Sequence, residues 1–384
     1  MIYLDNNATT KPLPEVVDAM TIALTEIWHN PSSTHRAGQN AKHCVETARA
    51  RLAALIGARP RELTFTGTGT EAIDLAIRGT LGVNKKTSVV TTGIEHHAVT
   101  ALCERLGTGG TEIRSAPVGL SGVVDPDAVL SLIDGTTGIV SVQWINNETG
   151  CIQPVLEIAR ACNERGVVFH CDATQAVGKI PIDLGAPGMP RIDLLNFAPH
   201  KFHGPKGVGV LRTARTTKLL PTIVGTQELG RRGGTEGVPA IAGAGAAAEQ
   251  AMLWLSDDTN RERIGELRDE LEHGILEHCP GATVNGDPTR RVWNTTNIGF
   301  PRLEAEALLL LLSESGVCIS AGSACASGSI EPSPVILAMG TDPKTAHGSV
   351  RFSLSRFTTP GEIRDAIGLV GAAVDRLSRT LPGV

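Results

Sequence analysis

The chain has 384 residues, 41% of them hydrophobic, which is enough to bury a sizeable core in one large domain and one smaller domain. Its formal net charge of −5 disfavours nucleic acid as a partner, because phosphate binding needs a basic face. The first residues lack the basic and apolar regions of a signal peptide, and no apolar stretch is long enough to span a bilayer, so we expect no membrane partner.

Apolar residues at helical spacing predict two helices near the start of the chain, over Pro14–Ile27 and Gln39–Ile56. A strand-like segment follows at Leu63–Phe65, and Thr70 begins a third helix. Short apolar runs then recur, each followed by a polar turn and usually by a helix. They lie at Ser88–Val90, Ile139–Val142, Val167–Phe169, Leu194–Phe197 and Val208–Leu211. This βαβ pattern predicts a largely parallel sheet with helices on both faces.

An alanine-rich helix over Val238–Leu255 and a charged helix over Asp258–His278 are expected next. We place a domain boundary between them, with residues 15–256 forming a large domain and residues 1–14 and 257–384 forming a small one. The remaining predicted elements of the small domain are strands at Val292–Phe300 and Val350–Leu354 and helices at Leu303–Ser315 and Pro360–Leu377.

Two predicted strands of the large domain are followed by residues of opposite charge. Asp172 ends one apolar run, and Lys201 lies in a short polar turn after another. An amine that forms a Schiff base and a carboxylate that keeps a pyridinium nitrogen protonated are what a pyridoxal phosphate (PLP) enzyme needs. A capping acid and a solvated lysine are the commoner explanation of either residue alone, so the interpretation depends on what else converges on them.

The segment Thr66–Glu71 follows the first predicted strand and begins a helix. Free N–H groups at a helix start, with the hydroxyls of Thr68 and Thr70, suit a dianionic phosphate. An ordinary N-cap explains the same residues equally well. The segment is not a Walker loop, because it lacks the Gly-Lys-Ser/Thr ending.

Polar groups follow two more predicted strands. His96 and His97 can supply a ring that stacks on a cofactor and a group that transfers protons. Asn146 and Asn147 lie at a strand's carboxyl end, where α/β folds bind ligands. A hydrogen-bonding loop histidine and an asparagine turn are the alternatives.

Eight scattered cysteines form no C-x-x-C pair, which disfavours a metal site held by this chain alone and indicates a reducing, cytoplasmic compartment. Cys325 differs from the others because glycine, alanine and serine surround it, as is typical of an accessible, reactive thiol. An incidental cysteine in a loop is the alternative. Arg351 lies in an apolar strand and needs an anion, either a substrate carboxylate or an internal ion pair.

Seven motifs together resemble the NifS/IscS-type cysteine desulfurases, which belong to the class V aminotransferases and the fold-type I PLP enzymes. They are YLDNNATT, NPSSTHRAGQ, GIEHHAV, NNETG, DATQAVGK, HKFHGPKGVG and SAGSACASG. Since they run in the family's order from Tyr3 to the Cys325 segment, the resemblance covers most of the chain. It implies an α/β fold whose large domain has a mostly parallel seven-stranded sheet, a smaller α+β domain, and a homodimer with active sites at the subunit interface.

The resemblance also implies which residues bind the cofactor. Lys201 would carry PLP covalently, Asp172 would pair with its pyridinium nitrogen, and Gln175 would bond its ring hydroxyl. His96 would stack on the ring and relay protons. The phosphate would be held by Gly69, Thr70 and His200, joined by Thr235 of the partner subunit.

For the substrate, the resemblance implies that Asn147, which would also contact the cofactor, and Arg351 hold the carboxylate of L-cysteine. Cys325 would be the nucleophile. The expected reaction removes sulfur from L-cysteine, leaving L-alanine and a persulfide on Cys325 for an acceptor protein, such as an iron–sulfur scaffold or another thiolation partner.

Other functions remain open at this point. A selenocysteine lyase, a related class V aminotransferase or a non-catalytic scaffold in a sulfur-transfer complex would share much of this pattern. A nucleotide-binding α/β protein is disfavoured, because the chain lacks the Walker and dinucleotide glycine patterns.

The chain departs from the family's pattern in two places. Ala198, followed by Pro199, stands where a phosphate-binding hydroxyl residue is usual. The helix start reads Gly67-Thr68-Gly69-Thr70 where the family usually has Ser-Gly-Ala-Thr, so the hydroxyl of Thr68 is a candidate to compensate.

Overall fold

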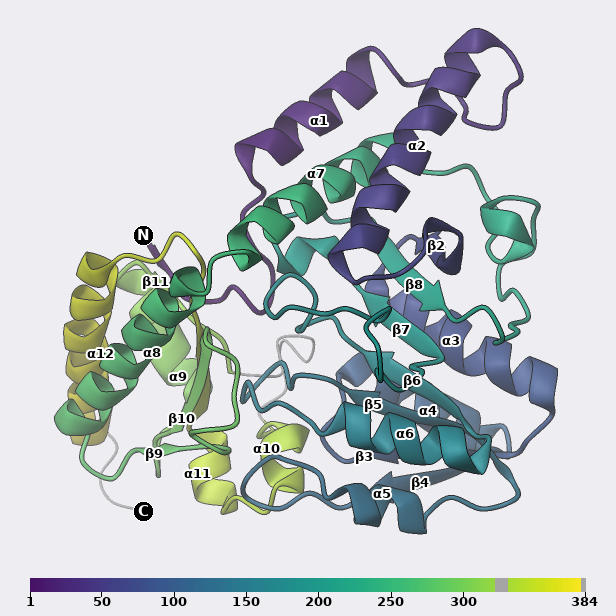
Figure 1. Ribbon diagram of the computed structural model, residues 1–384. Coiled ribbons are helices and arrows are strands. Elements are labelled where there is room, and N and C mark those ends of the chain that lie inside the picture. The colour runs from purple at the N-terminus through teal and green to yellow at the C-terminus, as the bar shows by residue number, and fades with distance from the viewer. Residues whose placement is uncertain (322–330, 381–384) are drawn as a thin grey trace.

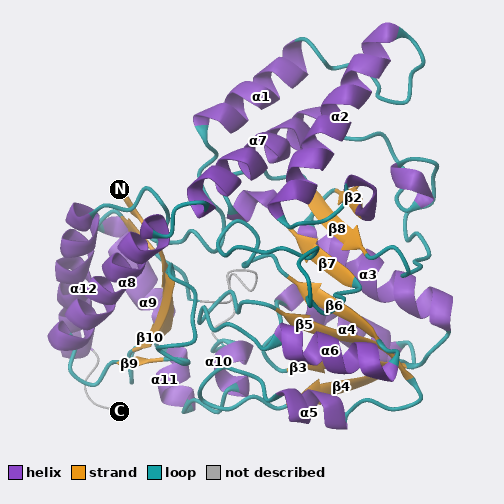
Figure 2. Ribbon diagram, viewed as in Figure 1, coloured by secondary structure: helices purple, strands orange, loops and turns teal. Residues whose placement is uncertain are grey.

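A seven-stranded sheet forms the centre of the larger part of the molecule (Figures 1 and 2). The computed structural model describes residues 1–321 and 331–380. The strand order is β2-β8-β7-β6-β5-β3-β4, and of these described strands β8 alone runs in the direction opposite to the other six. The strands are β2 (Leu63–Thr66), β3 (Ser88–Thr92), β4 (Glu112–Ala116), β5 (Thr137–Gln143), β6 (Val168–Asp172), β7 (Leu194–Phe197) and β8 (Gly209–Thr213).

Helices cover both faces of this sheet, and neighbouring residues of a strand pack against opposite layers. Val89 and Ile139 pack with α3 and α4, whereas Val90 and Val140 belong to the core that includes α5 and α6. Because both faces are buried, the central strands have apolar residues at consecutive positions, as in Val89-Val90 and Ile139-Val140. The helices of this part are α1 (Pro14–Thr25), α2 (Arg36–Leu55), α3 (Gly69–Asn84), α4 (His97–Thr108), α5 (Pro126–Ser131), α6 (Val155–Arg165) and α7 (Val238–Leu255).

The long helix α7 lies against both α1 and α2 (Figure 1). Glycines on α7 permit this close approach. A Cβ added to Gly243 would lie 2.7 Å from Met20 of α1, and one added to Gly245 would lie 2.7 Å from Ala48 of α2. The three helices therefore form one closely packed layer.

A second hydrophobic core lies in the smaller α+β part, where residues such as Ile264, Phe352 and Ile363 are buried. Its three-stranded antiparallel sheet has the order β12-β10-β9, and β1 pairs with β11 in a separate two-stranded sheet. The elements are β1 (Ile2–Tyr3), α8 (Thr259–His278), β9 (Thr283–Val284), β10 (Thr295–Gly299), α9 (Ala305–Glu314), β11 (Val317–Cys318), α10 (Pro334–Ala338), α11 (Pro343–His347), β12 (Ser349–Ser353) and α12 (Pro360–Thr380).

The first residues of the chain connect the two cores. Leu4 is buried in the smaller core and Leu13 in the larger one. Between them, the backbone N–H of Asn6 donates to the Ser353 carbonyl of β12, and the N–H of Thr10 donates to the carbonyl of His200. The N-terminal segment therefore runs past the carboxyl edge of the central sheet.

The described helices include no candidate membrane span. None in residues 1–321 or 331–380 combines the length and the apolar character that crossing a membrane requires.

Candidate active site

A cavity of about 300 Å³ lies at the carboxyl edge of the central sheet. Gln143 ends β5 and Asp172 ends β6 at this edge, Ala198 follows β7, and Gly69 begins α3. Eight of the site residues expected from the sequence line the cavity together. They are Gly69, Thr70, His96, Asn147, Asp172, Gln175, His200 and Lys201.

Asp172 is buried at the end of β6, with one carboxyl oxygen held in place. Its Oδ1 accepts hydrogen bonds from the backbone N–H of Thr174 at 3.0 Å and from Nδ2 of Asn196 at 2.9 Å. These bonds orient the carboxyl group and leave Oδ2 for a ligand. A carboxylate fixed in this way suits a cationic N–H group.

Lys201 projects its amine toward the N-terminal segment. Nζ donates to the carbonyls of Asn7 at 2.8 Å and Ala8 at 2.9 Å. Lys201 ends a short helical turn whose preceding residue, His200, accepts a bond from the N–H of Thr10. Backbone groups from two distant parts of the chain therefore position the amine at the cavity.

His96 is held as a neutral imidazole with a defined tautomer. It is the N-cap of α4, and its Nδ1 accepts the N–H of Ala98 at 3.1 Å, so the ring proton lies on Nε2. Burial lowers the pKa of His96, and the nearby Lys201 lowers it further. His97, the other candidate of the pair, is exposed on the first turn of α4.

The N-terminus of α3 forms one wall of the cavity. A Cβ added to Gly69 would lie 3.4 Å from the Cβ of Ala198. The start of α3 is therefore close to Ala198, the residue that stands where the family usually has a phosphate-binding hydroxyl. Burial lowers the pKa of His200 to about 3, which makes this histidine a neutral hydrogen-bonding group. Thr68 also lines the cavity, and its Oγ1 caps α3 by accepting the N–H of Glu71 at 3.1 Å.

Thr174 is a cavity residue that our sequence reasoning missed. Its hydroxyl would lie 3.8 Å from a Cβ at Gly69, beside the start of α3. Nδ2 of Asn196 donates to Thr174 Oγ1 at 3.1 Å, which leaves the hydroxyl proton available to an anion. The available signal was the Asp-x-Thr sequence after β6, since the Asp172–Thr174 turn directs this side chain.

Arg351 is 2% exposed and forms the internal ion pair that the sequence left open. Its guanidinium donates to Asp5 Oδ1 at 2.7 Å and to the carbonyl of Asn147 at 3.0 Å. The Nε of Arg351 and the Oδ1 of Asn147 are buried and have no hydrogen-bond partner among the described residues. Of these two groups, the acceptor belongs to a residue that lines the cavity, and the donor belongs to the arginine that contacts this residue.

Two of the remaining expected site residues are not brought to this cavity. Arg351 and Thr235 are absent from its described lining, and Thr235 is exposed. Cys325 belongs to residues 322–330, outside the described part of the chain.

Comparison with known proteins identifies the family. The model of the family "Aminotransferase class-V" matches residues 2–365. The chain belongs to the class-V aminotransferase family.

Full-length relatives of this class-V aminotransferase are cysteine desulfurases. A "Cysteine desulfurase" of Trichormus azollae is 45% identical and covers 100% of this chain and 95% of the relative. "Cysteine desulfurase NifS" of Azotobacter vinelandii is 44% identical, covering 99% and 94%. A solved "NIFS-LIKE PROTEIN" superimposes with a TM-score of 0.90 at 33% identity, over 98% of this chain and 100% of that one. The expected family, fold class and cysteine desulfurase function are therefore confirmed.

Proposed function

We propose that this chain uses PLP to convert L-cysteine to L-alanine and that Cys325 receives the sulfur. In the balanced reaction, L-cysteine and the Cys325 thiol give L-alanine and a Cys325 persulfide. The observation that carries the proposal is one cavity that gathers Lys201, Asp172, Gln175 and His96 at the start of α3.

The residues of the cavity fit PLP. The N–H groups at the start of α3, with Thr70 and His200, would hold the phosphate, since a helix N-terminus attracts anions. Asp172 would face the ring nitrogen through Oδ2, and Lys201 would link to the cofactor. When bound, PLP supplies an electron sink that makes the Cα proton of an amino acid removable.

The chain's own groups would handle the protons and the substrate. Lys201, fixed by two carbonyls, would take the Cα proton, and His96 would offer the proton on Nε2 to the cavity. The unpaired Nε of Arg351 suits a substrate carboxylate. Because Asp5 already bonds Nη2 of this guanidinium, a carboxylate that also used Nη2 would replace Asp5.

Cys325 would attack the sulfur of bound L-cysteine, and the C–S bond would break as the new S–S bond forms. This role rests on its motif, since Cys325 lies outside the described residues. Transfer to an iron–sulfur scaffold or another thiolation partner would regenerate the thiol. We further propose a homodimer, in which Thr235 of the partner subunit completes the phosphate site, and a cytoplasmic location, which the free thiols of the described cysteines support.

The purified protein should have the visible absorbance of bound PLP and form alanine from L-cysteine. In Cys325→Ala, alanine formation should fall by on the order of a thousandfold or more, because the nucleophile is gone, while the absorbance persists. Cys44→Ala is the matched control, since this thiol lies half-buried on α2, away from the cavity. Full activity of Cys325→Ala would refute the proposed nucleophile.

A substrate comparison separates desulfuration from neighbouring activities. L-cysteine, L-selenocysteine and L-alanine would be offered to the same preparation, with removal of sulfur or selenium and amino-group transfer measured in parallel. A preference for amino-group transfer, or for L-selenocysteine alone, would contradict the proposed reaction.

A further inference from the structure

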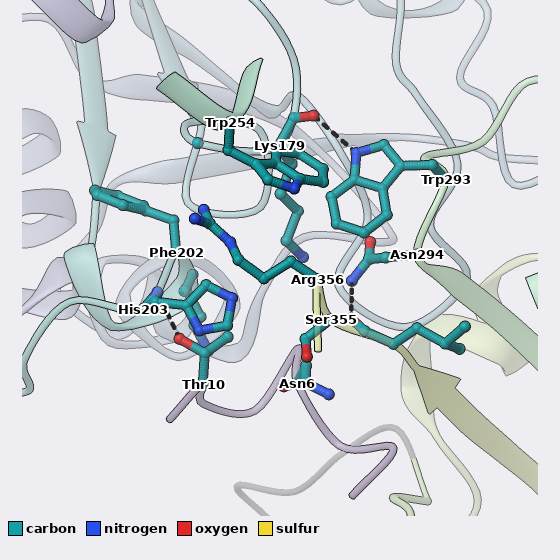
Figure 3. Close-up of a pocket in the computed structure, with 13 residues that line it drawn as sticks. Asn6, Thr10, Lys179, Phe202, His203, Trp254, Trp293, Asn294, Ser355 and Arg356 are labelled. Carbon is teal, nitrogen blue, oxygen red and sulfur yellow. Dashed lines mark hydrogen bonds between the residues drawn. The ribbon is translucent and has the colours of Figure 1, made fainter. Parts of the chain in front are cut away.

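Lys179 is a buried lysine beside the site, and the proposed reaction does not use it. It is 4% exposed and does not line the main cavity. It lines instead a second cavity of about 20 Å³, which Lys201 also lines. Figure 3 shows the Trp293 indole bonded to the Lys179 carbonyl, with the lysine side chain extending toward Asn294.

The amine of Lys179 contacts two side-chain amides rather than an acid. Nζ lies 2.6 Å from Oε1 of Gln175 and 2.7 Å from Oδ1 of Asn7. Burial lowers the pKa of Lys179 well below its usual value, and the charges of Lys201 and Arg351 lower it further. The amine is therefore a hydrogen-bond donor whose charge the surroundings disfavour.

These contacts determine which way the Gln175 amide points. Nε2 of Gln175 donates to the backbone carbonyl of Asn7 at 3.0 Å, and that carbonyl can only accept. On the other side, Oε1 accepts from Lys179. A reversed amide would place two acceptors together on one side and two donors on the other. The orientation is thus fixed from both ends, and one N–H of Nε2 remains for the cavity.

Asn7 is itself fixed by bonds to both cores. Its Nδ2 donates to the carbonyl of Asn147 and to Oγ1 of Thr295, so its Oδ1 must face Lys179 and Asn294. The side-chain amides of Asn7 and Gln175 therefore each have one allowed orientation. Lys179 links the two, because its amine donates to the oxygen of both amides.

We propose that Lys179 is a positioning residue, which holds the Gln175 amide so that it presents an N–H donor to the ring hydroxyl of PLP. This inference rests on the proposed function, because it needs PLP in the cavity. A donor at the ring oxygen stabilises the negative charge of that oxygen and so weakens its hold on the neighbouring proton of the cofactor's link to Lys201. Loss of the donor should make that proton harder to remove.

The test is the midpoint of the pH titration of the bound cofactor's visible absorbance. In Lys179→Met, which keeps the volume and removes the donor, the midpoint should rise by about one unit, the effect of one hydrogen bond to a charged group. Gln175→Leu should raise it similarly, and the double variant should match Gln175→Leu alone. An unchanged midpoint in Lys179→Met would overturn the proposal. If the shifts of the two single variants added in the double variant, the proposal would also be overturned. Lys179 would then act on the cofactor through its charge and not through Gln175.

Asn294→Ser is the matched control, because Asn294 donates to the same Oδ1 of Asn7 but does not touch Gln175. Its melting temperature should fall while its midpoint stays that of the wild type; an equal shift would mean general loosening and would overturn the proposal. If Lys179→Met does not fold, Lys179→Gln, which retains a shorter donor, should give a smaller rise that disappears in the Gln175→Leu background. Wild-type protein without the PLP absorbance would refute the proposed function instead.

Discussion

At the scale of single residues, the wall around Gly69 determines how tightly the phosphate would be held. Ala198 contributes a methyl group there, and Thr68 uses its hydroxyl oxygen to cap α3. Thr174 places a hydroxyl on the same wall, with its oxygen already accepting from Asn196. We expect Thr174 to compensate for the missing hydroxyl at residue 198, because its Oγ1 would lie 3.8 Å from a Cβ at Gly69, the same position that Ala198 approaches.

Thr174→Val should therefore weaken PLP binding by about tenfold, since it removes one hydrogen bond to a charged group and keeps the shape of the side chain. Thr174→Ser should restore most of the affinity because it returns the hydroxyl. Both are measured by titrating cofactor-free protein with PLP. A Val variant that binds PLP as tightly as the wild type would show that this hydroxyl does not reach the phosphate.

The cavity residues that the sequence alone predicted are those that lie at or soon after the end of a strand, or at the start of a helix. Asp172 ends β6 and Gly69 begins α3, so the alternation of elements brought both to one edge of the sheet. Lys179 and Asn7 were missed because their contact joins positions 172 residues apart. No local pattern encodes such a hydrogen bond, and the ion pair of Arg351 with Asp5 has the same long-range character.

At the scale of elements, α7 is a helix whose packing depends on small residues on its buried face. Most of its buried residues are alanine or glycine, and α1 and α2 approach it closely. Gly245 lies against the backbone of α2, since an added Cβ would be 2.7 Å from the Cα of Ala48. Overpacking at such a contact forces backbone shifts.

Gly245→Ala should lower the free energy of unfolding by about 1–3 kcal/mol, although alanine favours helices. Gly265→Ala on α8 is the control, because a Cβ there meets only Trp293, at 3.9 Å, so helix propensity should raise stability by about 0.5–1 kcal/mol. Denaturant unfolding of both variants measures the difference. If both substitutions stabilised the protein, α2 would be able to move away from residue 245 without a loss of stability.

The strands of the central sheet that contain an apolar run were predictable from the sequence, and the edge strand without such a run was not. The strands β5 and β7 are buried at every position, and both are rich in apolar residues in the sequence. The edge strand β4 has the sequence EIRSA with only its last residue buried, so it gave no such signal. Its place in the sheet comes from pairing with β3, which is a tertiary contact.

At the scale of the whole molecule, one short segment indicates where a second subunit would bind. Glu228 is anchored, since its carboxylate bonds the guanidinium of Arg49 and the N–H of Phe65. Leu229, the next residue, has a φ of 58° and is 72% exposed, and Val224 nearby in sequence is 86% exposed. The left-handed backbone conformation of Leu229 has an energetic cost. Because the conformation directs an apolar side chain outward, we expect this side chain to contact a partner subunit.

The same segment continues to Thr235, which is exposed and lies outside this chain's own cavity. If Thr235 serves the site of the other subunit, two defective variants should complement each other. Lys201→Ala cannot hold PLP covalently, and Thr235→Ala should bind it about tenfold more weakly. In a mixed dimer, the site with an intact Lys201 receives the intact Thr235 of the partner subunit, so one site per dimer should regain native affinity. Co-expression with two affinity tags, followed by PLP titration, measures this. A mixed dimer that binds PLP no more tightly than Thr235→Ala would show that Thr235 does not act across the interface.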